Sequence, residues 1–148
     1  MGSEMCIRDR FNFWCELQHN GADLQKEILN LKGVHCNPDS ARCLFQSMKE
    51  VINDPEKSQL DRAIAFYIVN KCSFSGLTES SSFSEQASES NFSIRGIEKL
   101  TGYQELIQSW IITSHSYERL LCADWDRKRH FIYTVSYTHL TLPTILRV

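Results

Sequence analysis

The sequence predicts an α/β fold, and two observations favour it. Apolar residues recur at helical spacing through most of residues 11–72. Short apolar runs that are typical of strands follow late in the chain, at residues 109–113 and 130–133. Helices interleaved with short apolar strands favour an α/β protein over an all-helical bundle.

Each expected helix is predicted from its own apolar stripe. A stop near Asn20-Gly21 separates the first two helices, and Asp54-Pro55 ends the third because the residue before a proline is biased away from helix. Residues 60–72 form the strongest helix, which is apolar over most of its circumference and should be buried on more than one side. The expected helices span residues 11–20, 22–31, about 40–52, 60–72, 97–108 and 117–122.

A serine-rich segment, residues 73–93, interrupts these patterns. Nine of its 21 residues are serine, with Phe74, Phe83 and Phe92 spaced between them. The segment is too poor in aliphatic residues to build core, so it is expected to be a long loop. A flexible linker is the alternative, and the three aromatic residues argue against it.

The two ends of the chain resemble translated sequencing adaptor. The transposon mosaic end that tags fragments in sequencing libraries translates to residues 5–10, Met-Cys-Ile-Arg-Asp-Arg. The adaptor bases before it translate to residues 1–4. Residues 135–148 match the adaptor at the other end. The native piece is therefore expected to run from Phe11 to about Tyr133, with tails that contribute no native packing.

Composition excludes several classes of function. Without the adaptor residues, the 16 basic side chains become 16 − 3 = 13 and the 18 acidic ones 18 − 2 = 16, a net charge of −3. Any DNA contact must then come from a local basic patch. No CxxC pair is present, so His35-Cys36 near Cys43 is a poor metal frame, and reduced thiols of a cytosolic protein explain the cysteines better. No apolar run approaches the roughly 18 to 20 residues that span a bilayer.

One stretch carries a family resemblance. Residues 62–77, Arg-Ala-Ile-Ala-Phe-Tyr-Ile-Val-Asn-Lys-Cys-Ser-Phe-Ser-Gly-Leu, resemble a signature of the D12-class N6-adenine DNA methyltransferases. That signature is an apolar helix, then Asn-Arg/Lys, two residues, an aromatic, Asn/Ser and Gly-Leu. Residues 84–97 look like the phage-type target-recognition insert, and residues 11–27 resemble the helix after the second Rossmann strand. Residues 111–121 and 131–133 resemble the strand, small helix and strand that precede the catalytic motif, so the resemblance covers nearly all of the native piece in order.

The resemblance implies an internal fragment of a Rossmann-like, S-adenosylmethionine-dependent methyltransferase with a helical, loop-rich insert that reads double-stranded DNA. The parent enzyme would flip an adenine out of the duplex, at an unstacking cost of roughly a few kcal/mol, and methylate its N6 directly. An Asp-Pro-Pro-Tyr motif should follow Tyr133, where adaptor residues stand instead. No catalytic residue and no metal ligand is therefore predicted, and the fragment is expected to be inactive.

The resemblance also implies site residues. Phe74, with Ser75 and Leu77, matches the loop that approaches the duplex at its target; a core position at a helix end is the alternative for Phe74. Ser116 and Tyr117 match a pair that touches the adenine ring of S-adenosylmethionine. The predicted DNA-binding residues are Asn70, Lys71, Phe74, Ser75, Leu77, Asn91 and Arg95.

The predicted organisation follows from these assignments. Adaptor would occupy residues 1–10 and 135–148. Residues 11–59 would hold helices of the truncated core or the start of the insert, 60–108 the insert, and 109–134 a return to the Rossmann-like core. The setting implied is the cytoplasm of a bacterial or phage-infected cell, with restriction-modification as a possible role. Two alternatives stay open, a non-catalytic DNA-binding or helical interaction module and a chance reading frame without a fold.

Overall fold

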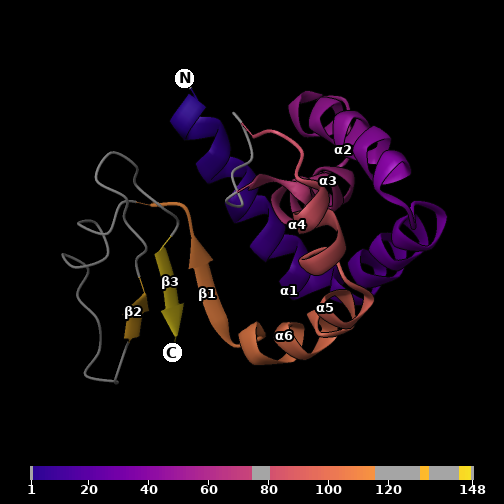
Figure 1. Ribbon diagram of the computed structural model, residues 1–148. Helices are drawn as coiled ribbons and strands as arrows, with labels where there is room; N and C mark the ends of the chain where they lie inside the picture. Colours follow the sequence, from indigo (N-terminus) through magenta and orange to yellow (C-terminus); the bar gives the residue numbers. More distant parts are fainter. Residues whose placement is uncertain (1, 75–80, 116–130, 134–143, 148) are drawn as a thin grey trace.

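The computed structural model describes residues 2–74, 81–115, 131–133 and 144–147, and helices dominate it (Figure 1). Helix makes up 75% of the structure. The elements in chain order are α1 (Gly2–Val34), α2 (Pro38–Asn53), α3 (Gln59–Cys72), α4 (Glu85–Ser90), α5 (Ile94–Glu98), α6 (Leu100–Ile107), β1 (Trp110–Thr113), β2 (Phe131–Tyr133) and β3 (Thr144–Arg147).

The predicted α/β fold class, with its Rossmann-like sheet, is wrong. The helical body formed by residues 2–74 and 81–115 contains the single strand β1, and no sheet forms within that part of the chain. β3 pairs antiparallel with β1 and with β2 at the C-terminal side of that body. A Rossmann-like core needs parallel strands joined by crossover helices, and no described strand pair is parallel. The apolar runs do form short strands, but they follow the helices instead of alternating with them.

α1 is longer than the sequence suggested. Helix α1 is interrupted at the stop expected near Asn20-Gly21: Asn20 has the non-helical angles φ −124° and ψ 29°, so two helical segments meet there at a kink. Gly21 packs so closely on α6 that an added Cβ would lie 2.6 Å from the Gln104 side chain. The packing of α6 onto α1 therefore holds the two halves in one kinked helix.

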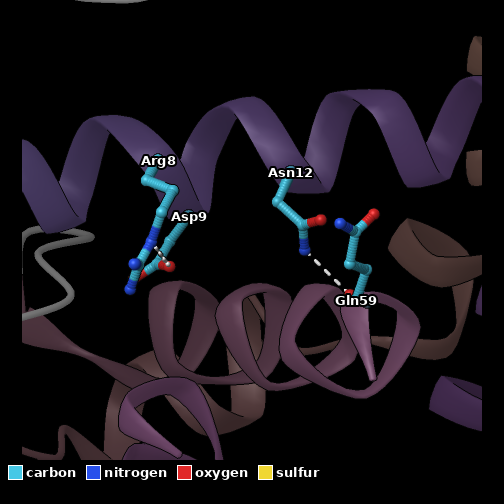
Figure 2. A network of polar contacts seen from close by, with 4 residues as sticks. All are labelled: Arg8, Asp9, Asn12 and Gln59. Atoms are coloured by element: carbon cyan, nitrogen blue, oxygen red, sulfur yellow. Dashed lines mark hydrogen bonds and ion pairs between the residues drawn. The ribbon is translucent and has the colours of Figure 1, made fainter. Parts of the chain in front are cut away.

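α1 also continues into the residues assigned to adaptor. Asp9 is buried and lies 4.0 Å from Arg8, while Asn12 donates a hydrogen bond of 2.8 Å to the Gln59 carbonyl at the start of α3 (Figure 2). The expectation that the tails contribute no packing is therefore wrong at Asp9. Nothing in residues 5–10 breaks a helix, so α1 extends over them and carries Asp9 onto the body.

The helices after α1 begin and end as their end signals predict. The Asn37 side chain caps α2 by accepting a hydrogen bond of 2.8 Å from the Ser40 amide, and α2 ends before Asp54-Pro55. Ser58 caps α3 in the same way, through the Asp61 amide. The helix expected at residues 97–108 is divided at Lys99 into α5 and α6.

α3 forms the centre of the molecule. It packs against α1 on one side and α2 on the other, and α6 packs against α1 (Figure 1). Its burial on several sides confirms the prediction made for residues 60–72. The largest fully buried side chains are Phe45, Phe92, Leu17, Leu24, Ile28, Ile68, Ile97, Val69, Cys72 and Ser73.

The serine-rich segment contributes to this core, contrary to the prediction of a loop without core residues. It contains α4, and the Phe92 side chain is 0% exposed. A β-bridge joins Ser73 to Phe83, and the Phe83 ring meets the Phe45 ring of α2 edge-on at 5.7 Å. Two aromatic side chains thus supply the apolar contact that aliphatic residues supply elsewhere.

Candidate nucleic-acid interface

The candidate interface is built where α3 ends and the serine-rich segment begins. Ser73 leaves the helix in an extended conformation, and the Phe74 amide donates a hydrogen bond of 3.1 Å to the Ser82 carbonyl. The Ser84 amide donates to the Cys72 carbonyl at 2.9 Å. These two bonds and the Ser73–Phe83 bridge fix the backbone on both sides of residues 75–80.

Phe74 is an exposed aromatic residue on this fixed backbone. Its side chain is 70% exposed, so the alternative that placed it in the core is wrong. Its ring therefore contributes little to the core and is accessible to a ligand.

Lys71 lies one turn of helix before Phe74. Its Nζ is 5.7 Å from the centroid of the Tyr67 ring, and its charge is half-exposed at the end of α3. Asn70 has a structural contact, because its carbonyl accepts a hydrogen bond of 3.1 Å from the Ser73 hydroxyl. Lys71 carries the positive charge of the predicted Asn70-Lys71 pair, and lysine contacts phosphate as a point charge.

Tyr67 connects this end of α3 to the turn between α4 and α5. It is buried, and its ring stacks on Phe13 with centroids 6.0 Å apart. A Cβ added at Gly96 would lie 3.9 Å from Tyr67 Oη and 3.8 Å from the Asn91 carbonyl oxygen. Burial, and then the neighbouring Tyr103 and Cys72, raise the pKa of Tyr67 to about 12, so its hydroxyl stays neutral.

Asn91 and Arg95 are exposed on that turn. Asn91 ends α4, where its amide donates 2.8 Å to the Ala87 carbonyl, and Arg95 lies in the first turn of α5. Ser93 caps α5 by accepting a hydrogen bond of 3.2 Å from the Gly96 amide. Gly96 of α5 therefore lies near both the Asn91 carbonyl and the Tyr67 hydroxyl, and the Lys71 Nζ lies 5.7 Å from the Tyr67 ring centroid.

Four predicted site residues lie outside the described residues. They are Ser75 and Leu77 of the proposed DNA loop, and Ser116 and Tyr117 of the proposed cofactor contact. The basic run at residues 127–129 lies outside them as well.

Sequence reasoning missed three cations that contact the serine-rich segment. Lys32 Nζ lies 4.8 Å from the centroid of the Phe92 ring, and Arg42 Cζ lies 5.0 Å from that of Phe83. Lys49 donates a hydrogen bond of 3.1 Å to the Ser81 carbonyl. A sequence signal for two of them exists, because residues spaced seven apart, as Arg42 and Lys49 are, share a helix face.

An open cleft of about 530 Å³ between α1, α2 and α3 is a poor site for nucleic acid. Its charged lining consists of three carboxylates and two lysines, so its net charge disfavours phosphate. The charged residues are Asp23, Lys26, Glu27, Lys57 and Asp61.

Metal and membrane sites were sought in the same described part of the chain. It holds no group of three metal-ligating side chains, and His35 Nδ1 lies 3.1 Å from the Ser40 carbonyl oxygen. None of its helices is long and apolar enough to cross a membrane. No protein-family model matches the chain, and no curated protein matches its sequence.

Proposed function

We propose that this chain is a DNA-recognition part of a D12-class N6-adenine DNA methyltransferase, and that its helical body binds double-stranded DNA. The observation that carries the proposal is Phe74, an exposed aromatic residue on a fixed backbone within the stretch that resembles the family signature. The mostly helical structure of residues 60–108 is compatible with the helical insert that the resemblance implies.

The chemistry of Phe74 fits a nucleic-acid ligand. Apolar wedges that insert between base steps unstack them and open the duplex, which is the first requirement for flipping a base. Because the hydrogen bonds of the Phe74 and Ser84 amides hold the backbone, the ring can enter the duplex without the entropic cost of ordering a loop.

Lys71 and Arg95 are proposed as the charged contacts. Lysine contacts phosphate as a point charge, and arginine can also pair with guanine through two hydrogen bonds. Lys71 is partly exposed at the end of α3, and Arg95 is exposed after the α4–α5 turn. A local patch of this kind allows DNA binding by a chain whose net charge is −2.

The parent enzyme is proposed to take its methyl group from S-adenosylmethionine. The cofactor contacts proposed in this chain, Ser116 and Tyr117, lie outside the described residues. The chain carries no Asp-Pro-Pro-Tyr run, so we propose recognition without methyl transfer for the chain as it stands.

A labelled DNA duplex titrated with the full chain at several salt concentrations tests the proposal. We expect binding whose logarithmic affinity falls linearly with the logarithm of salt, by about 0.9 for each phosphate neutralised. A Lys71→Gln variant should lower this slope by about one phosphate, whereas Lys57→Gln, in the mixed-charge cleft, should leave it unchanged. A chain that binds no duplex at low salt would contradict the proposal.

A helical interaction module is the second candidate, and one observation favours it. Tyr103 and Leu106 on α6 and Ile111 on β1 are exposed large apolar side chains. Exposed apolar clusters mark protein contacts. This candidate would be favoured if the chain does not bind DNA but self-associates or binds a partner protein, and if Leu106→Ala abolishes that association.

A further inference from the structure

Two lysines hold the serine-rich segment on the helical body from opposite sides. Lys32 of α1 donates a hydrogen bond of 3.3 Å to the Ser88 carbonyl, and Lys49 of α2 donates one of 3.1 Å to the Ser81 carbonyl. Ser81 and Ser88 are buried. A buried carbonyl without a donor costs free energy, so each ammonium group satisfies a group that water does not readily reach.

Each lysine also lies over an aromatic ring. Lys32 Nζ is 4.8 Å from the Phe92 ring centroid, and Lys49 Nζ is 5.7 Å from that of Phe45, the residue on which Phe83 packs. A cation over a ring face is attracted by the ring's quadrupole. The carbonyl and the ring together fix where each ammonium group lies.

The two attachment points determine where the proposed DNA contacts lie. Ser81 is next to Ser82, whose carbonyl accepts the Phe74 amide. Ser88 lies in the last turn of α4, just before Asn91 and the α5 turn that carries Arg95. The Lys49 contact is therefore adjacent to the hydrogen bond that fixes the Phe74 backbone. The Lys32 contact is adjacent to the turn that carries Arg95.

We infer that Lys32 and Lys49 are positioning residues of the DNA interface, which hold the serine-rich segment in place and do not contact phosphate. The inference rests on the proposed function. Both side chains are half-buried and already donate to protein carbonyls. Each ammonium group uses one of its three N–H donors on a protein carbonyl and lies beside an aromatic ring. We therefore assign its charge to the fold of the interface and not to the affinity for the DNA backbone.

Hydrogen exchange of the full chain without DNA tests the positioning role directly. In Lys49→Met, which keeps the apolar stem, the amides of Phe74 and Ser84 should exchange about tenfold faster. In Lys32→Met, the amides of Asn91 and Phe92, which both donate to the Ala87 carbonyl, should respond similarly. Lys49→Arg should restore protection, and Lys57→Met serves as the matched control.

Duplex binding by the same variants supplies the second readout. Affinity should fall in Lys32→Met and Lys49→Met with the salt slope unchanged, because no phosphate contact is lost. Unchanged exchange rates would overturn the inference, as would a slope that becomes shallower by about 0.9 in either variant. If the wild-type chain binds no duplex, the proposed function fails, while the exchange rates alone still decide whether the lysines hold the segment.

Discussion

At the residue scale, two titratable side chains of α3 are buried in their neutral forms. Burial raises the pKa of the Cys72 thiol from 9.0 to about 11, against a smaller lowering by the charge of Lys32. Burial likewise raises the pKa of Tyr67 from 10.0 to about 12. Folding therefore favours the protonated form of both groups, and each raised unit corresponds to about 1.4 kcal/mol.

The resulting pH dependence is a testable prediction. Because both folded pKa values lie above the unfolded ones, this stabilisation is complete below pH 9.0 and is lost as the pH rises towards about 11 for Cys72 and about 12 for Tyr67. Urea unfolding at increasing alkaline pH measures the loss. Cys72→Ala should flatten the part of the profile that begins at pH 9.0, and Cys43→Ala, at an exposed thiol, should not. Identical profiles for both variants would refute the assignment to Cys72.

Phe92 is the residue through which the serine-rich segment enters the core. Its side chain is 0% exposed, so Phe92→Ala should reduce the free energy of unfolding by about 3 to 5 kcal/mol through lost burial and the cavity left behind. Chemical denaturation measures this loss. Phe74→Ala is the control, and its unfolding free energy should change little because Phe74 is exposed. Equal losses in the two variants would contradict the described packing.

At the element scale, the capping side chains mark where helices start. Asn37→Ala removes the acceptor for the Ser40 amide at the start of α2, and it should lower the free energy of unfolding by about 1 kcal/mol. Asn30→Ala, at an exposed position within α1, should be neutral or slightly stabilising because alanine is the better helix former. The two denaturation midpoints should therefore move apart, and a shared shift would count against the cap.

Local signals predicted some elements well because their causes are local. The Asn37 cap, the Asp54-Pro55 stop and the apolar circumference of residues 60–72 lie within the elements that they define. The strand predicted at residues 109–113 corresponds closely to β1, which spans Trp110–Thr113. The resemblance to a family signature led to Phe74, whose exposure the structure then established.

Other features depend on contacts between distant residues, which no local pattern contains. The break expected at Asn20-Gly21 is present as a kink, but the sequence did not show that Gln104 of α6 packs against Gly21 there. The Gln18 side chain also donates 2.7 Å to the Ile107 carbonyl at the end of α6. The fold class failed for the same reason, because short apolar runs do not show whether strands alternate with helices or follow them.

The core role of the serine-rich segment was equally hidden from the sequence. The low number of aliphatic residues predicted a loop. In the structure, Phe92 and Phe83 supply apolar contact area. Lys32 and Lys49 supply hydrogen bonds from other helices. Both kinds of contact join the segment to residues more than thirty positions away.

At the scale of the whole molecule, one continuous core joins α1, α2 and α3 with Phe92 and Ile97. A single core of this kind unfolds cooperatively in small domains. Thermal unfolding followed by circular dichroism should therefore show one transition. A gradual, probe-dependent loss of signal would contradict a single cooperative core.

Trimming the N-terminal end tests how much the first residues matter. Because residues 1–7 are assigned to adaptor, a chain that begins at Arg8 should keep the melting temperature of the full chain. A chain that begins at Phe11 also loses the buried Asp9, and its melting temperature reports what that residue contributes. A marked fall in the first chain would show that residues 2–7 stabilise the fold.

The central claim is that the helical body binds DNA through Phe74. Phe74 and Leu106 are exposed to a similar degree, 70% and 65%, so the alanine variants at these positions form a matched pair. A duplex that carries 2-aminopurine reports binding by anisotropy and unstacking by fluorescence. We predict that Phe74→Ala abolishes the fluorescence rise and weakens binding by roughly five- to a hundredfold, in line with stacking worth about 1 to 3 kcal/mol per base. Leu106→Ala should change neither signal. Equal behaviour of both variants and the wild-type chain would contradict the account.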